Sequence, residues 1–143
     1  MRLPYLDAVF HEALRIYPPI TFLVNRTCTK RCRIGDIDFY PGVQIGIPVW
    51  NIHHDPYIWP EPEHFKPERF YMRKDYDPMS WLPFGTGPRN CFGMRFATAE
   101  YKTTIARLLL QFKIVADPEV KLTLQDTLGM LQVPYIRVKL QKR

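Results

Sequence analysis

A glycine-rich loop at residues 84–93, reading F-G-T-G-P-R-N-C-F-G, is the feature that most constrains this chain. It places one cysteine, Cys91, directly before residues 94–111, whose apolar side chains recur with helical spacing. Backbone N–H groups and the macrodipole at a helix N-terminus stabilise a thiolate. The glycines permit positive φ and the close approach of a flat ligand, and Arg89 adds a fixed cation. The loop therefore predicts a site for a flat, anionic, metal-bearing ligand, with Cys91 as the metal ligand.

The helical spacing of residues 3–16 and 94–111 and the short strand patterns elsewhere predict a mainly α fold with small antiparallel β-sheets, and the composition agrees with a packed core. The 143 residues are 46% hydrophobic, which is enough for a packed core, and include 14 prolines, which favour long ordered loops. The net charge of +6 favours an acidic partner or an anionic surface, and we expect no nucleic-acid partner. Three cysteines, an odd number, indicate no disulfide framework and fit a reducing compartment.

Residues 3–16 predict a core-facing helix. Apolar side chains lie on one arc, Pro4 is allowed in the first turn, and the Pro18-Pro19 pair ends the helix. Glu12 and Arg15 lie three residues apart at the edge of that arc. From the residues alone, such a pair is more often a solvated surface ion pair that contributes a few tenths of a kcal/mol, on the order of 0.3.

The remaining segments predict short strands and an ordered meander. Residues 20–50 alternate in hydrophobicity between turn signals, as in a small antiparallel sheet. Residues 56–80 combine prolines with aromatic residues, which indicates an ordered meander rather than a disordered linker. In the helix 94–111 an apolar stripe is expected to be buried, and residues 112–140 predict a β hairpin with strands at 112–115, 120–124 and 135–140.

Cys28 and Cys32, taken with His53 and His54, raise the alternative of a zinc site. The spacing C-x-x-x-C differs from the usual C-x-x-C, and no second cysteine pair follows. We therefore expect a packing role for the two histidines at the end of a short helix.

Three motifs in this sequence resemble the cytochrome P450 family. The loop fits the pattern F-x-x-G-x-R-x-C-x-G at every fixed position, through Phe84, Gly87, Arg89, Cys91 and Gly93. Residues 12–15 match E-x-x-R, and residues 67–70 match P-E-R-F, in the family's order. A lone cysteine is usually a small buried apolar residue, but five matching positions at fixed spacing reverse that expectation. The chain resembles most closely the microsomal drug- and steroid-oxidising branch that includes thromboxane synthase.

The resemblance implies a role for particular residues. Cys91 is expected to be the axial thiolate on the iron of haem b, iron-protoporphyrin IX. Phe84, Gly87, Arg89 and Gly93 are expected to contact this cofactor, and Arg26 corresponds to a propionate-binding arginine. Glu12, Arg15 and Arg69 are expected to form a buried structural network behind the loop. The expected substrate pocket comprises Pro19, Ile20, Thr21, Phe22, Leu23, Gly129 and Met130.

The function implied by the resemblance is that of a haem-thiolate monooxygenase. Such an enzyme inserts one oxygen atom from O2 into an apolar substrate, using electrons from NADPH-cytochrome P450 reductase, with cytochrome b5 as a further candidate partner. The cations Arg73, Lys74, Arg89, Arg95 and Lys102 are candidates for the reductase surface. A location on the cytoplasmic face of the endoplasmic reticulum membrane, through an anchor on the parent protein, is also implied.

Two other functions remain open at this point. One is a haem-thiolate isomerase or dehydratase that rearranges an endoperoxide without a reductase. The other is a truncated product without activity, because the family is roughly three times as long as this chain and the motifs belong to its C-terminal part. We expect residues 1–143 to form the C-terminal part of a single, incomplete domain, inactive alone, with no catalytic residue besides the haem ligand.

Overall fold

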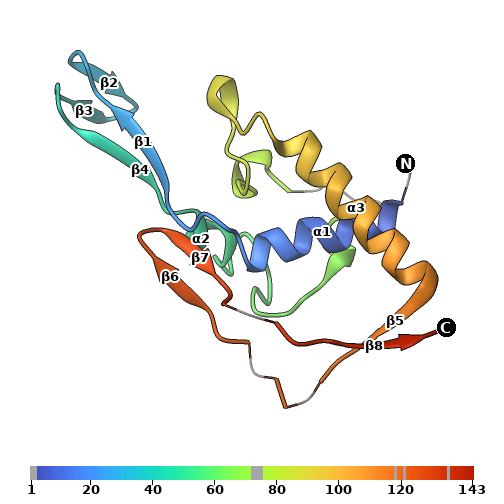
Figure 1. Ribbon diagram of the computed structural model, residues 1–143. Coiled ribbons are helices and arrows are strands. Elements are labelled where there is room, and N and C mark those ends of the chain that lie inside the picture. The colour runs from blue at the N-terminus through green and yellow to red at the C-terminus, as the bar shows by residue number, and fades with distance from the viewer. Residues whose placement is uncertain (1–2, 72–75, 118, 121, 135) are drawn as a thin grey trace.

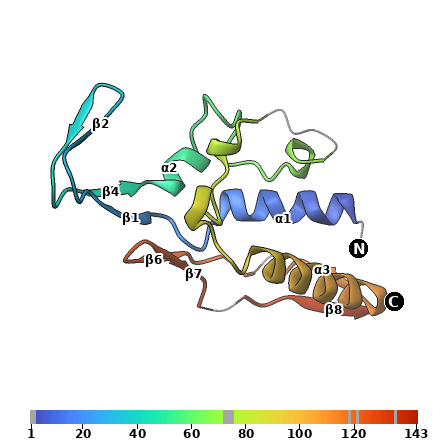
Figure 2. The ribbon, with the colours of Figure 1, turned by 90° about the horizontal axis from the view of Figure 1, so that it is seen from above.

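The computed structural model describes residues 3–71, 76–117, 119–120, 122–134 and 136–143, except for the side chains of residues 23–25. Two long helices, α1 (Pro4–Ile16) and α3 (Met94–Gln111), lie against each other, and irregular chain and short strands surround them (Figures 1 and 2). A short helix, α2 (Val49–His53), precedes the meander. Among the described residues, no helix has both the length and the apolar character needed to cross a membrane.

Within the part of the chain that the structure describes, the strands form four separate two-stranded antiparallel sheets, so the predicted combination of helices with small antiparallel sheets is confirmed. β1 (Leu23–Thr27) pairs with β4 (Gln44–Ile47), and β2 (Cys32–Ile34) pairs with β3 (Ile37–Phe39). β5 (Phe112–Val115) pairs with β8 (Lys139–Lys142), and β6 (Gln125–Thr127) pairs with β7 (Met130–Gln132). The first two pairs form an arm that extends away from the helices, at the upper left of Figure 1.

The strand predicted at residues 120–124 is wrong, because the described residues of that segment form no strand and β6 begins at Gln125. The reason is the turn between β6 and β7, where Leu128 and Gly129 have φ of +54° and +80°. Two central residues with positive φ form the kind of two-residue hairpin turn that fixes the register on both sides. The final strand likewise lies later than predicted, and Tyr135 lies outside the described residues.

The core lies between α1, α2 and the meander. Its buried apolar side chains include Ala8, Phe10, Ile16, Val49, Trp59 and Leu82, and Cys28 is buried separately after β1. The 3-10 helices of the meander and loop are η1 (Pro67–Arg69), η2 (Pro78–Ser80) and η3 (Gly87–Arg89). Phe70 packs at the centre of an aromatic cluster with Trp59, Tyr76 and Trp81. The described aromatic residues of the meander therefore pack against one another.

The apolar stripe expected to be buried on α3 is only half-buried, and none of the residues of α3 falls in the buried class. One side of the helix contacts α1, where Tyr101 stacks on Phe10 with ring centroids 4.5 Å apart. Elsewhere α3 exposes large side chains, with Phe96 and Leu110 at 73% and 78% exposure. The periodicity predicted a helix correctly, but it does not say how much of the stripe another element covers.

Candidate haem site

The loop that carries Cys91 folds back on itself. The backbone N–H of Cys91 donates to the carbonyl oxygen of Phe84 at 2.8 Å, which closes the loop around η3. Gly85 and Gly87 have φ of +68° and +75°. A residue that has a Cβ adopts this left-handed region at a cost of about 1–2 kcal/mol. Gly93 differs from the expectation, because its φ is −81°. Its lack of a side chain matters instead for space, since a Cβ there would lie 3.7 Å from the Cys91 sulfur.

Cys91 is one of the residues that line a cavity of about 370 Å³ between this loop and the β1–β4 pair. Cys91 is exposed and makes no disulfide, and it lies three residues before the first residue of α3. Two arginines, Arg26 from β1 and Arg89 from the loop, line the same cavity. Its apolar and backbone wall comprises Ile20, Ile45, Ile47, Leu82, Pro83, Phe84, Gly85 and Thr86.

This set of groups fits haem. A thiol is a soft ligand for iron, and two guanidinium groups match the two carboxylates that haem carries. The aliphatic side chains and Phe84 suit an apolar macrocycle. The positive φ of Gly85 and Gly87 keeps the loop backbone open toward a flat group. The residues present therefore offer a thiol, two cations and an apolar wall, which are the groups that one side of a haem requires.

Glu12, Arg15 and Arg69 meet in a buried network. Arg15 donates from Nε and Nη2 to the two carboxylate oxygens of Glu12, both at 2.9 Å. Arg69 Nε donates to Glu12 Oε1 at 3.3 Å, and the backbone N–H of Lys66 donates to the same oxygen at 2.9 Å. Both side chains of the Glu12–Arg15 pair are 0% exposed. This geometry is the bidentate form of the pair, and it replaces the solvated surface pair considered above.

Arg15 also ties distant segments together through their backbone. Its Nη1 donates to the carbonyl oxygen of His53 at 2.8 Å, and its Nη2 donates to that of Pro62 at 2.7 Å. Its guanidinium lies over the ring of Trp59 at 5.6 Å from the centroid. One side chain of α1 thus holds the end of α2 and the start of the meander.

His53 connects this network to the cysteine loop, a role that sequence reasoning missed. Its Nε2 accepts from the backbone N–H of Leu82 at 2.8 Å, so the proton of the neutral ring lies on Nδ1, which donates to the Arg15 carbonyl oxygen at 3.1 Å. Burial lowers the pKa of His53 to about 4, so the ring is neutral near pH 7. The sequence predicted only a general packing role for His53 and His54, and 29 residues separate the two hydrogen-bonded groups.

The predicted pocket residues lie where the β6–β7 turn meets the chain after α1. Ile20 lines the same cavity as Cys91 and forms an isolated antiparallel β-bridge with Met130. The carbonyl oxygen of Pro19 accepts from the backbone N–H of Leu131. Gly129 accepts from the backbone of Thr21, whose hydroxyl donates to Asp126 Oδ2 at 2.6 Å.

The two remaining pocket candidates differ in what the structure describes. The ring of Phe22 lies where a Cβ on Gly46 would stand, so this glycine makes room for it. Leu23 begins β1, but its side chain lies outside the described residues.

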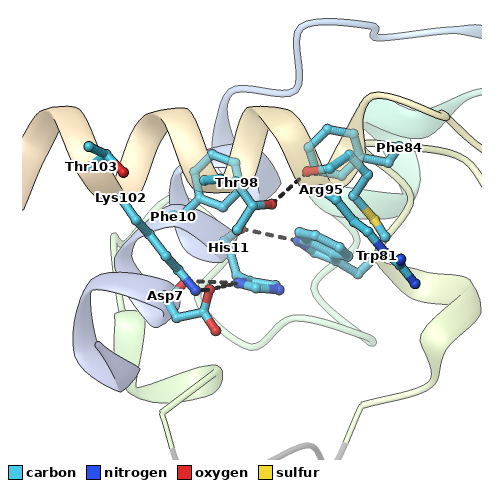
Figure 3. Close-up of a pocket in the computed structure, with 11 residues that line it drawn as sticks. Asp7, Phe10, His11, Trp81, Phe84, Arg95, Thr98, Lys102 and Thr103 are labelled. Atoms are coloured by element: carbon cyan, nitrogen blue, oxygen red, sulfur yellow. Dashed lines mark hydrogen bonds and ion pairs between the residues drawn. The ribbon is translucent and has the colours of Figure 1, made fainter. Parts of the chain in front are cut away.

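A second, larger cavity of about 550 Å³ lies between α1, α3 and the Trp81–Phe84 segment. Figure 3 shows Asp7 and His11 of α1 and Lys102 of α3 pointing toward one another across it. Lys102 Nζ lies 2.7 Å from Asp7 Oδ1, and the ring of His11 stacks on Trp81. None of the described residues that line this larger cavity is a cysteine. The smaller cavity, which Cys91 lines, is therefore the better candidate for metal chemistry.

Comparison with known proteins assigns this sequence to a family. The family model described as Cytochrome P450 matches residues 1–140. The chain is 43% identical to Cytochrome P450 3A5 of Homo sapiens over 134 residues, which cover 92% of this chain and 26% of that protein. It is 39% identical to Cytochrome P450 3A27 of Oncorhynchus mykiss over 144 residues, covering 99% of this chain and 27% of that protein.

A third relative, Cytochrome P450 3A19 of Capra hircus aegagrus, is 40% identical over 135 residues, which cover 92% of this chain and 62% of that protein. The chain thus spans 26% and 27% of the length of the human and trout relatives. With the family match over residues 1–140 and the cysteine loop in place, the chain belongs to the cytochrome P450 family.

Proposed function

We propose that this chain supplies the thiolate side of a haem b site in a monooxygenase. The observation that carries the proposal is the cavity in which the Cys91 sulfur lies with Arg26, Arg89 and an apolar wall. Membership of the cytochrome P450 family supports the same cofactor. When bound, the haem would supply the activation of O2.

Each wall of the cavity has its own task in this proposal. Cys91 would bind the iron through its sulfur, and its electron donation favours O–O cleavage. Arg26 and Arg89 would each bind a propionate, and Phe84 would pack beside the sulfur and limit its contact with water. Gly87 and Gly93 would keep the loop backbone close to the flat group without a clashing side chain. Ile20, Ile45 and Leu82 would exclude water from the cofactor's apolar face.

The Glu12–Arg15–Arg69 network and His53 would act structurally. They hold the backbone that precedes the loop, since His53 accepts from the N–H of Leu82 and Glu12 accepts from the N–H of Lys66. Pro19, Ile20, Thr21, Phe22 and Leu23, together with Gly129 and Met130, would face the substrate. The bridge between Ile20 and Met130 supports this arrangement, because Ile20 also lines the haem cavity.

The proposed reaction is the insertion of one atom of O2 into a C–H bond of an apolar molecule. NADPH, through a flavoprotein reductase, would provide two electrons, and the second oxygen atom would leave as water. To test it, the full-length parent protein with haem, reductase and NADPH is incubated with ethylbenzene under ¹⁸O₂, and the alcohol is analysed by mass spectrometry. Label in the alcohol that requires NADPH supports the proposal. Unlabelled product, or turnover without NADPH, contradicts it.

The reductase is proposed to approach the cysteine loop through exposed cations. Arg89 and Arg95 are exposed, whereas Lys102 is paired with Asp7 and its side chain is only 16% exposed. Arg73 and Lys74 lie outside the described residues. Since Arg89 would be paired with a propionate, the proposed reductase surface centres on Arg95, and cytochrome b5 could use the same cation because both partners would be acidic.

Charge reversal tests this surface with a matched control. Arg95→Glu should slow reduction by the reductase and weaken its dependence on salt, because steering by opposite charge is screened by ions. Lys142→Glu makes the same change in net charge on β8, away from the loop, and should leave the rate unchanged. Equal effects of the two substitutions would contradict the surface.

The location is proposed from the resemblance to the microsomal branch. We infer a parent protein anchored in the endoplasmic reticulum membrane with this part on the cytoplasmic face, where NADPH and the reductase are available. Fractionation of cells that express the parent gene, followed by protease treatment of intact vesicles, would test both statements. Protection of the chain from protease would contradict the cytoplasmic orientation.

A further inference from the structure

The two cysteines that the haem site leaves unused, Cys28 and Cys32, lie together at the base of the β2–β3 hairpin. Their sulfur atoms are 4.0 Å apart. Cys28 follows the end of β1 and is buried, whereas Cys32 begins β2 and is exposed. The backbone fixes both positions, because Cys28 exchanges hydrogen bonds with Gly42 and Val43, and Cys32 pairs with Phe39.

We propose that Cys28 and Cys32 are a redox pair that a peroxide converts reversibly into a disulfide. A disulfide requires a sulfur separation of about 2.05 Å, so the two atoms must approach by about 2 Å. Since the Cys32 side chain is exposed, rotation about its Cα–Cβ bond sweeps through solvent rather than through core. The pair joins one accessible thiol to one sheltered thiol, as a reacting and a resolving cysteine require.

The chemistry balances with a peroxide as the oxidant. The Cys32 sulfur attacks one oxygen of hydrogen peroxide, the O–O bond breaks, and a sulfenic acid and one water are formed. The Cys28 sulfur then attacks the Cys32 sulfur, the S–S bond forms, and the S–O bond breaks to release a second water. The two thiols lose two electrons and two protons, and a thiol reductant such as glutathione reverses the change.

A metal site is the other use of neighbouring thiols, and the surroundings disfavour it. Within the described ranges, no group of three or more His, Cys, Asp or Glu side chains could hold a metal ion. The Cys28 thiol instead donates to the carbonyl oxygen of Lys30 at 2.9 Å. Reduced solvation and the neighbouring Cys28 thiol raise the pKa of Cys32, so its reaction with peroxide should become faster as the pH rises. Because the described neighbours offer too few further ligands for a metal ion, the pair fits oxidation better than ligation.

The sequence between the two cysteines makes the test direct. Lys30 and Arg31 lie between them, so trypsin separates residues 27–30 from residues 32–33 unless a disulfide joins the two peptides. The full chain is treated with hydrogen peroxide, its remaining thiols are alkylated, and the digest is analysed by mass spectrometry. We expect the joined peptide, at the summed mass less two hydrogen atoms, and its loss after dithiothreitol.

Variants separate the pair from a single reactive thiol. In Cys28→Ser, Cys32 lacks its resolving partner, so its sulfenic acid should accumulate and react with dimedone. In Cys32→Ser, the joined peptide should be absent. Cys28 should stay a reduced thiol, because its burial shields it from peroxide, and it should be alkylated once the chain is unfolded. Cys91, on peptide 90–95, is the internal control and should not join either peptide. Alkylation of both Cys28 and Cys32 after peroxide, a sulfinic acid on Cys32, or a link to Cys91 would overturn the proposal.

Discussion

The loop that carries Cys91 and the network that supports it differ in burial and in hydrogen bonding. Cys91 is exposed, and η3 before it has no buried residue. Glu12, Arg15 and His53, in contrast, are 0% exposed, and each makes hydrogen bonds to a separate segment of the chain. The rigidity of the loop therefore comes from behind it, while the front of the loop is left open for a ligand. Changes in the network should cost stability, and changes at the front should cost ligand binding.

The largest effect is expected from breaking the buried ion pair. Glu12→Ala leaves Arg15 as a buried charge without its partner, which should lower the free energy of unfolding by about 3–5 kcal/mol. Urea unfolding followed by circular dichroism measures the loss, and haem uptake should fall with it. Glu63→Ala removes an exposed carboxylate from the meander and is the matched control, expected to change stability by less than about 0.5 kcal/mol. Equal effects would mean that the network does not hold the fold.

A pH titration should show the next largest effect. The pKa of His53 is about 4 in the folded chain and 6.5 as the ordinary value. Between pH 6.5 and 4 this histidine is protonated in the unfolded chain but neutral in the folded chain. Its contribution to the free energy of unfolding is therefore fully present above pH 6.5 and is lost as the pH falls toward 4. The loss is about 3 kcal/mol.

The His53→Gln substitution isolates that contribution. Glutamine can accept from Leu82 and donate to the Arg15 carbonyl without titrating, so its stability should vary less between pH 6.5 and 4 than that of the unaltered chain. His64→Gln, at a side chain that is 68% exposed, should leave the pH dependence unchanged. If His53→Gln preserved the whole pH dependence, another group would be responsible.

Two glycines of the loop should respond differently to the same substitution. Gly87→Ala places a Cβ at φ of +75°, so it should lower the free energy of unfolding by about 1–2 kcal/mol although no atom lies within 4 Å. Gly93→Ala has an ordinary φ of −81° and brings its Cβ to 3.7 Å from the Cys91 sulfur, which is van der Waals contact. It should cost less than about 0.5 kcal/mol. Thermal unfolding without ligand measures both, and the reverse order would contradict the backbone argument.

The smallest effect is expected at the Asp7–Lys102 ion pair across the larger cavity. Asp7 is 41% exposed, so solvent screens the pair and Lys102→Met should change stability by less than about 1 kcal/mol. Asp7→Asn is its counterpart, and the double variant gives the coupling energy of the two side chains. A coupling energy above about 2 kcal/mol would mean that this ion pair stabilises the fold as the buried network does, and would contradict its description as a solvent-screened pair.

Sequence patterns predicted those parts of the molecule that local chemistry determines. Pro18 and Pro19 set the end of α1, glycine explained the positive φ of Gly85 and Gly87, and the spacing of Glu12 and Arg15 allowed their contact. Contacts between distant segments were beyond such patterns. The bond from Leu82 to His53 needs the fold of the whole meander, and the register of β6 depends on a turn whose Leu128 takes an unusual positive φ.

The cysteines show the same limit. Cys28 and Cys32 have an uninformative spacing in the sequence, and only the pairing of β1 with β4 and of β2 with β3 shows that their sulfur atoms are neighbours. The partial exposure of α3 could not be predicted from the sequence either, because an apolar stripe on a helix does not show which other elements cover it.

The central claim, that Cys91 is the ligand of haem iron, is tested most directly by the absorption spectrum of the chain with haem after reduction and addition of carbon monoxide. We predict the red-shifted Soret band of thiolate-ligated iron, and its loss in Cys91→Ser. Cys32→Ser, at the other exposed cysteine, should keep the band. A band that survives in Cys91→Ser, or that disappears in Cys32→Ser alone, would contradict the assignment of the iron ligand.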